Sequence, residues 1–189
     1  MQVIKWVQFL KEGLPLNGNL SSMTVGIFDG VHLGHQALIR KIISHDTSFI
    51  PVIVTFRQNH KAGGKEIQNF DKKLDMFKNM GIQITVVIDF TSEFKQMPGI
   101  EFLQLLLKHG NIGFFAAGQN FRCGHQMDTE MPVILDFFAS NGISAEIVPE
   151  VYYPAAGLDN SLPVSSSRIR TALAAGDTTL AQKMLGYPI

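Results

Sequence analysis

The chain contains 189 residues, of which 46% are hydrophobic, and its 16 basic and 16 acidic residues give a formal net charge of zero at pH 7. A neutral chain without a run of lysine or arginine is not expected to bind nucleic acid or an anionic membrane surface as its main partner. The length suits one domain, residues 1–189, with a sizeable core, and no apolar run approaches the roughly 20 residues of a membrane-spanning helix.

The opening residues, M-Q-V-I-K-W-V-Q-F-L-K, mix lysines with apolar side chains and are not expected to form a secretory signal. After them, short apolar runs that predict strands alternate with longer stretches that predict helices. The predicted strands are Thr24–Phe28, Ile50–Phe56, Gln83–Ile88, Ile112–Ala116 and Ala145–Pro149. The predicted helices are Gly34–Ser44, Asp71–Met80, Gly99–His109 and Met131–Ser140.

This alternation predicts an α/β fold, and the runs V-I-V-T-F and I-T-V-V-I are apolar on both faces, as expected for strands covered by helices on both sides. We therefore expect a doubly wound, Rossmann-like domain with a five-stranded parallel sheet. Gly81, Gly110 and Gly142 are expected just past helix ends, in the left-handed conformation. Residues 57–69 and 150–164 are expected to be loops without regular structure that flank a ligand cleft.

The segment T-V-G-I-F-D-G-V-H-L-G-H-Q, residues 24–36, predicts a strand, a glycine-containing turn and a helix start. Glycines let the backbone approach a bulky anion, and a helix start presents unpaired N–H groups to it. His32 and His35 lie three positions apart, so both rings can reach one phosphate chain. Alone, they also fit an incidental surface pair. A zinc site is not expected, because Asp29 is the only further ligand nearby.

A second anion-binding helix start is expected at V-S-S-S-R-I-R-T-A-L, residues 164–173. Ser165 is a natural N-cap, and hydroxyl groups at a helix start with an arginine one turn later suit an anion. The alternative is an ordinary surface helix whose Arg168 and Arg170 are solvated. Two such helix starts in one chain favour the anion-binding interpretation.

The segment F-D-G-V-H-L-G-H-Q resembles the H-x-G-H turn of nucleotidyltransferases. It is most similar to the FMN adenylyltransferase (FAD synthetase) module of bacterial bifunctional riboflavin kinase/FMN adenylyltransferases. The resemblance implies a nucleotidyltransferase-type fold and catalytic roles for His32, His35 and Arg170. It also implies ATP contacts by Gly26, Ile27, Phe28, Asp29, Gly34, His35, Ser165, Ser166, Ser167 and Arg170. Magnesium is expected with ATP, and Asp29 is expected either to orient the turn or to lie near the metal.

Two segments in the middle of the chain, F-T-S-E-F-K-Q-M-P-G-I-E-F-L and A-G-Q-N-F-R-C-G, resemble further motifs of these adenylyltransferases. A flat flavin ring suits apolar and aromatic surface with a few polar groups, and Phe90 and Phe94 are candidates to add to the apolar part. The resemblance implies a flavin site at Phe56, Asn59, Gly118, Asn120, Phe121 and Arg122. Cys123 stands where the family usually has phenylalanine.

The reaction implied is ATP + FMN giving FAD and pyrophosphate. The family's T-F-x-P-H-P segment is here T-F-R-Q-N-H, without either proline, which leaves two alternatives open: another phosphate-ester acceptor, or a weakly active flavin- and ATP-binding module. The resemblance ends near Pro188, so no riboflavin kinase domain is expected within residues 1–189. Two interpretations stay open: a stand-alone adenylyltransferase supplied with FMN by a separate riboflavin kinase, or a truncated form of a longer chain. Because Cys123 is the only cysteine, no internal disulfide forms, which suits a cytoplasmic protein.

Overall fold

The computed structural model describes residues 1–57, 66–154 and 161–189. Its core is a six-stranded, wholly parallel sheet in the order β1-β4-β3-β2-β5-β8. These strands are β1 (Gln2–Lys5), β2 (Ser21–Gly26), β3 (Ile50–Phe56), β4 (Ile84–Ile88), β5 (Ile112–Gly118) and β8 (Ser144–Val148). The α/β class and the parallel sheet are confirmed, whereas the expected number of five strands is wrong.

The missed strand is β1, which pairs with β4 at the edge of the sheet. Only Ile4 of its four residues is buried, so the segment shows no apolar run of the kind that predicts a strand. The helix that follows it, α1 (Trp6–Glu12), was also not predicted, because its buried residues are only Trp6 and Phe9. Short elements at a sheet edge carry too little periodicity to be recognised.

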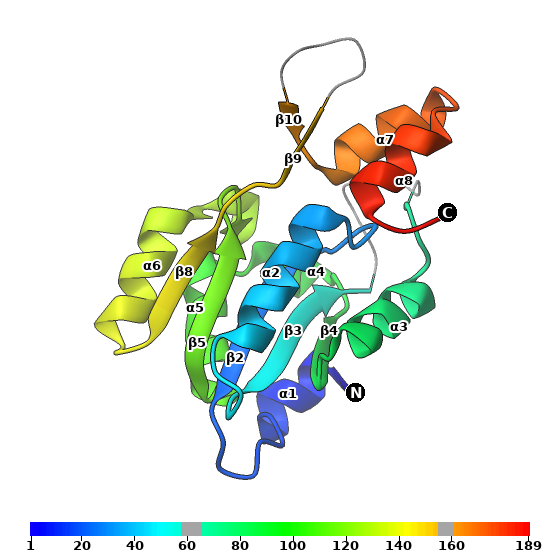
Figure 1. Ribbon diagram of the computed structural model, residues 1–189. Helices are drawn as coiled ribbons and strands as arrows, with labels where there is room; N and C mark the ends of the chain where they lie inside the picture. The colour runs from blue at the N-terminus through cyan, green and yellow to red at the C-terminus, as the bar shows by residue number, and fades with distance from the viewer. Residues whose placement is uncertain (58–65, 155–160) are drawn as a thin grey trace.

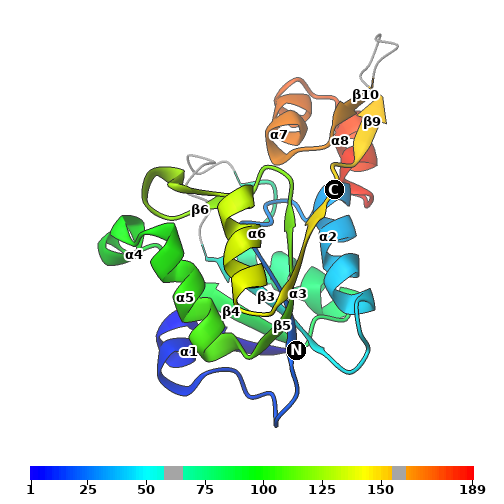
Figure 2. The same cartoon turned by 90° about the vertical axis from the view of Figure 1, so that its left-hand side faces the viewer.

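Helices cover both faces of the sheet, as Figures 1 and 2 show. One face packs against α2 (Leu33–Ser44) and α3 (Phe70–Met80), with Ile39, Ile42 and Phe77 fully buried against it. The other face packs against α1, α5 (Gly99–Gly110) and α6 (Met131–Ser140). A short helix, α4 (Ser92–Gln96), precedes α5. Among the described residues, no helix is both long enough and apolar enough to cross a membrane.

A smaller unit lies beyond the carboxyl ends of the strands (Figure 1). It contains α7 (Ser166–Ala174) and α8 (Thr178–Leu185), which share their own apolar cluster around Ile169, Met184 and Leu185. It also contains the hairpin of β9 (Tyr152–Pro154) and β10 (Ser161–Pro163). The expectation that residues 150–164 lack regular structure is therefore wrong. Pro154 and Pro163 fit because a two-stranded hairpin consists of edge strands only.

Two of the three predicted helix-ending glycines take left-handed angles, Gly81 (φ 102°) and Gly142 (φ 71°). Gly110 does not, because α5 runs through it and Asn111 (φ 42°) takes the left-handed position instead. Asparagine is the side chain, after glycine, that best tolerates this conformation. The loop expected at residues 57–69 lies mostly outside the described residues.

Candidate active site

The chain leaves β2 at Gly26 and turns sharply before α2 begins at Leu33. Three residues of this turn have left-handed backbone angles: Phe28 (φ 53°), Gly30 (φ 80°) and Val31 (φ 35°). Such angles are uncommon for Phe and strained for β-branched Val. Both side chains are almost fully buried, Phe28 at 1% and Val31 at 0% exposure, so packing holds the backbone in this conformation. Strand β2 accordingly ends before Phe28, where the sequence predicted its end.

His32 is the N-cap of α2, and its Nδ1 accepts a hydrogen bond from the backbone N–H of His35 at 3.4 Å. The two rings stack with their centroids 3.6 Å apart. Burial lowers the pKa of His32 from 6.5 to about 4. Burial, and next the charges of His32 and Lys73, hold the pKa of His35 well below its usual value. Both rings are therefore neutral at pH 7.

The accepted hydrogen bond fixes the tautomer of His32: Nδ1 carries the lone pair, so the proton sits on Nε2. In His35, Nδ1 is buried and has no hydrogen-bond partner among the described residues. A buried nitrogen without a partner costs less as a bare acceptor than as an orphaned N–H group, so His35 is also expected to carry its proton on Nε2. Each ring then offers one N–H donor.

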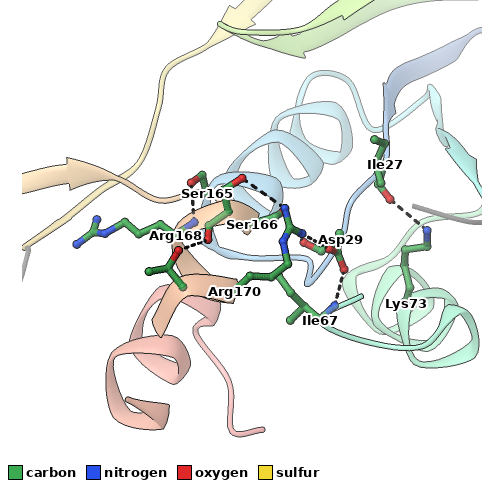
Figure 3. A network of polar contacts seen from close by, with 10 residues as sticks. Ile27, Asp29, Ile67, Lys73, Ser165, Ser166, Arg168 and Arg170 are labelled. Carbon is green, nitrogen blue, oxygen red and sulfur yellow. Dashed lines mark hydrogen bonds and ion pairs between the residues drawn. The ribbon is translucent and has the colours of Figure 1, made fainter. Parts of the chain in front are cut away.

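The two predicted helix starts meet through Asp29. Its Oδ2 accepts from Nη1 of Arg170 at 2.6 Å, and its backbone carbonyl accepts from Oγ of Ser166 at 2.8 Å. Figure 3 shows these contacts between the turn after β2 and the start of α7. At that start, Ser165 is the N-cap and accepts from the N–H of Arg168, as its sequence position predicted. Sites 141 residues apart in sequence are thereby joined.

Asp29 is the residue that sequence reasoning put forward for a magnesium contact. Its Oδ1 accepts from the backbone N–H of Ile67 and its Oδ2 pairs with Arg170, so both oxygens are engaged, and the side chain is 4% exposed. The described residues contain no group of three or more His, Cys, Asp or Glu side chains that could hold a metal ion. The side chains described here therefore do not provide a dedicated magnesium site.

One cavity of about 400 Å³ adjoins both helix starts and continues into an aromatic region. Its polar end is lined by Gly26, Ile27, Phe28, Asp29, His35, Ser165, Ser166, Ser167 and Arg170. Its apolar end is lined mainly by Phe56, Phe90, Phe94, Met97, Phe102, Phe121, Cys123 and Met127, with Asn120 and Arg122 beside them. His32 stacks on His35 and is 6% exposed, and Gly34 lies in the first turn of α2.

The apolar end is built from aromatic rings contributed by separate elements. Phe56, the last residue of β3, meets Phe90 and Phe94 edge-on, with centroids 5.7 and 5.8 Å apart. Phe94 in turn contacts Trp6 and Phe102. Edge-to-face contacts fix ring orientation as well as burying area. The result is a rigid apolar wall that suits a flat ring system.

The polar groups at this end are held by partners of their own. Nδ2 of Asn120 donates to Glu150 at 2.6 Å, and Arg122 forms an ion pair with Glu130 at 3.2 Å. Gly118 ends β5, and its carbonyl accepts from the N–H of Phe121. Asn59, the remaining residue expected at the flavin, lies outside the described residues.

The segment after β5 forms a small antiparallel pair, β6 (Arg122–Cys123) with β7 (Thr129–Glu130), around the 3-10 turn η2 (His125–Met127). Asp128 fixes it to the start of α5 by accepting from the N–H of Gly99. Gly124 has φ 87°, and a Cβ there would overlap Asp128 and the backbone of Gly99. Glycine is therefore required where the predicted flavin motif ends.

Lys73 is a buried residue of the site region that sequence reasoning missed. It is 6% exposed, and its ammonium donates to the carbonyls of Ile27 at 3.1 Å and Phe56 at 2.9 Å. Burial lowers its pKa from 10.5 to about 8, although the charges of Glu66 and Asp29 oppose that shift. Lys73 lies four residues before the buried Phe77, on the same helix face, and that spacing was the available signal.

A parallel α/β sheet with a cavity at the carboxyl ends of its strands, and two helix starts that converge on that cavity, is the arrangement expected of a protein of the nucleotidyltransferase type. More narrowly, the chain belongs to the FAD synthetase family, which matches residues 16–166. The resemblance stated from the sequence is thus confirmed.

Among curated relatives, the chain is 26% identical to the bifunctional riboflavin kinase/FMN adenylyltransferase of Buchnera aphidicola subsp. Schizaphis graminum, covering 100% of this chain and 60% of that protein. It is 30% identical to the Bacillus subtilis protein of the same name, over 89% of this chain and 54% of that one. A crystal structure described as a macrolide-efflux protein from Streptococcus pneumoniae superposes with a TM-score of 0.80 at 27% identity, covering all of this chain and 61% of the other. The chain thus spans about 60% or less of the length of the bifunctional relatives named here.

Proposed function

We propose that this chain transfers the AMP group of ATP to FMN and releases pyrophosphate, so that FAD is the product. The observation that carries the proposal is the single cavity that joins the polar end at His35 and Arg170 to the aromatic end at Phe56. A nucleotide triphosphate suits the polar end, and a flavin ring suits the aromatic end. The names of the curated relatives support the same reaction.

In this reaction an oxygen of the FMN phosphate attacks the α-phosphorus of ATP. The bond from that phosphorus to the bridging oxygen breaks, and pyrophosphate leaves with the electron pair. No protein nucleophile is needed, so catalysis consists of positioning the two substrates and stabilising the charge that builds up on pyrophosphate. The N–H donor of His35 and the guanidinium of Arg170 would provide that stabilisation, together with Ser165 and Ser167.

His32 and Ser166 would act partly by holding other residues of the site in place. His32 caps α2 and stacks on His35, and Ser166 donates to the carbonyl of Asp29. Magnesium would enter bound to the phosphates of ATP rather than to a site made of side chains. FMN would be supplied by a riboflavin kinase, an activity that the names of the relatives join to adenylyl transfer. A cytoplasmic location, where ATP is available, is part of this proposal.

The test is incubation of the protein with ATP, magnesium and FMN, followed by chromatographic measurement of FAD and of pyrophosphate. Equal amounts of the two products are expected. The T-F-R-Q-N-H segment favours a second candidate, adenylyl transfer to another phosphate ester, so nicotinate mononucleotide and phosphopantetheine are tested in parallel and products identified by mass. Binding of ATP and FMN without pyrophosphate release would instead indicate a binding module.

A further inference from the structure

The turn at residues 27–31, which we call the phosphate turn, is held by side chains from four other parts of the chain. Each side chain donates a hydrogen bond to one backbone carbonyl of the turn. Lys73 Nζ donates to Ile27 at 3.1 Å, and Ser166 Oγ donates to Asp29 at 2.8 Å. The Tyr187 hydroxyl donates to Gly30 at 2.6 Å, and Gln36 Nε2 donates to Val31 at 3.0 Å. Ser166 also lines the cavity. Lys73 and Tyr187 are not among its lining residues.

A hydrogen bond that holds a backbone carbonyl also orients the N–H group of the next residue. In a trans peptide, the C=O of one residue and the N–H of the next point in opposite directions, and no peptide bond of this structure is cis. Each captured oxygen therefore sets the direction of the following N–H group. The conformation held in this way is strained, because Phe28 and Val31 have left-handed backbone angles that side chains other than glycine rarely adopt. Packing of Phe28 and Val31 and the four side-chain hydrogen bonds together hold the turn in this conformation.

We propose that Lys73 and Tyr187 are positioning residues for adenylyl transfer, which act by holding the phosphate turn in its strained conformation. This inference rests on the proposed function, since it names further residues that the same site needs. Lys73 is expected to hold the turn more strongly than Tyr187, because hydrogen bonds from a charged donor are about twice as strong as those from a neutral donor.

Lys73 also links the two ends of the cavity. Its ammonium bridges the carbonyl of Ile27, where the chain has just left β2, and the carbonyl of Phe56, the last residue of β3. Ile27 lines the polar end of the cavity, and Phe56 lines its aromatic end. One cation therefore ties the two strand ends together just beyond their last ladder pair, Gly26 with Thr55, and helps to hold the donor and acceptor sites at a fixed spacing. In-line attack depends on that spacing, since a misplacement of about 1 Å can cost ~10²-fold in rate.

Tyr187 reaches the turn from the far end of the chain, just after α8. Its hydroxyl donates to Gly30, a residue whose φ of 80° allows the sharpest part of the turn. Gln36 strengthens the same junction, because its Nε2 donates both to Val31 and to the carbonyl of Leu185 at 2.7 Å. Burial raises the pKa of Tyr187 to about 12, so the hydroxyl keeps its proton at working pH.

The experiment compares Lys73→Met and Tyr187→Phe with matched controls in the whole chain. Lys78→Met makes the same chemical change at an exposed position of α3, and Tyr153→Phe removes a hydroxyl that is not one of the four groups holding the turn. The measurements are kcat for FAD formation at saturating substrates, KM for ATP and FMN, and the thermal midpoint of unfolding. Lys73→Met is expected to lower kcat by ~10- to 100-fold and Tyr187→Phe by ~3- to 10-fold, with both controls within about twofold of the parent chain.

A purely structural role would lower the thermal midpoint and leave kcat per folded molecule unchanged, and that result would overturn the proposal. Should Lys73→Met fail to fold, Tyr187→Phe decides alone, because it removes one oxygen near the end of the chain. If the parent chain makes no FAD, the proposed function fails. The positioning role is then judged by calorimetry with a non-hydrolysable ATP analogue: weaker binding in both variants supports it, and unchanged binding refutes it.

Discussion

The guanidinium of Arg170 donates to the carboxylate of Asp29 across 2.6 Å, although the two residues lie 141 positions apart. The carboxylate is 4% exposed and the guanidinium side chain 23%. Asp29 belongs to the phosphate turn and Arg170 to α7, so this ion pair is one of the contacts that hold the smaller C-terminal unit on the sheet, with those of Ser166 and Tyr187. It also leaves Arg170 lining the cavity with part of its surface available to an anion.

Replacing Asp29 by Asn keeps the size of the side chain and removes the charge that Arg170 faces. We expect the free energy of unfolding to fall by about 2 kcal/mol, less than the roughly 3–5 kcal/mol of a fully buried pair, because Arg170 is partly solvated. FAD formation should fall ~10-fold as the turn and α7 lose their alignment. Urea unfolding and steady-state assays measure the two effects. Asp89→Asn is the control, since its ion pair with Arg57 is exposed and worth under ~1 kcal/mol. Equal destabilisation by the two variants would argue against this role for the Asp29–Arg170 pair.

His35→Ala should reduce kcat by about 10²-fold or more, as the loss of one preorganised donor to developing charge commonly does. KM for ATP is expected to change far less, because the donor acts mainly on the transition state. His45→Ala is the matched control: it removes an exposed imidazole at the other end of the same helix. Normal turnover by the His35 variant would remove this ring from the mechanism.

The features that the sequence predicted well are those that are local. Gly81 with its positive φ, the Ser165 cap and the apolar central strands each depend on neighbours within a few residues. Strand β1 escaped prediction because a single buried side chain, Ile4, leaves no periodic pattern.

Contacts between distant segments could not be predicted in this way. Nothing in the sequence pairs Asp29 with Arg170 or Tyr187 with Gly30, because only the folded sheet brings those segments together. Lys73 stands beside Lys72, and the phase of the helix alone decides that one is buried and the other exposed. The prediction that both helix starts contact one nucleotide came from the family resemblance, because local patterns alone do not show that two segments meet.

The free energy of unfolding should decrease as the pH falls, because the buried histidines resist protonation in the folded state. The pKa of His32 is about 4 in the folded state and near 6.5 when exposed, so between these values the unfolded chain binds the extra proton and the folded chain does not. This contribution is complete above pH 6.5 and is lost as the pH falls toward 4, by up to ~3 kcal/mol. His32→Asn keeps an N-cap acceptor without a titrating group. Urea unfolding between pH 7 and pH 4 should show a shallower loss for this variant than for the parent chain, and parallel curves would contradict the assignment.

Phe56→Leu tests whether the aromatic end of the cavity is the acceptor site. Leucine preserves apolar volume but removes the ring that meets Phe90 and Phe94 edge-on. Aromatic pairs add ~0.5–1.5 kcal/mol beyond burial, so KM for FMN should rise ~2- to 12-fold. KM for ATP should stay within about twofold, because the phosphate end of the cavity keeps its contacts. Phe137→Leu, at a half-buried position on α6, controls for a general loss of packing. A rise in KM for ATP instead would place the nucleotide, rather than the flavin, against these rings.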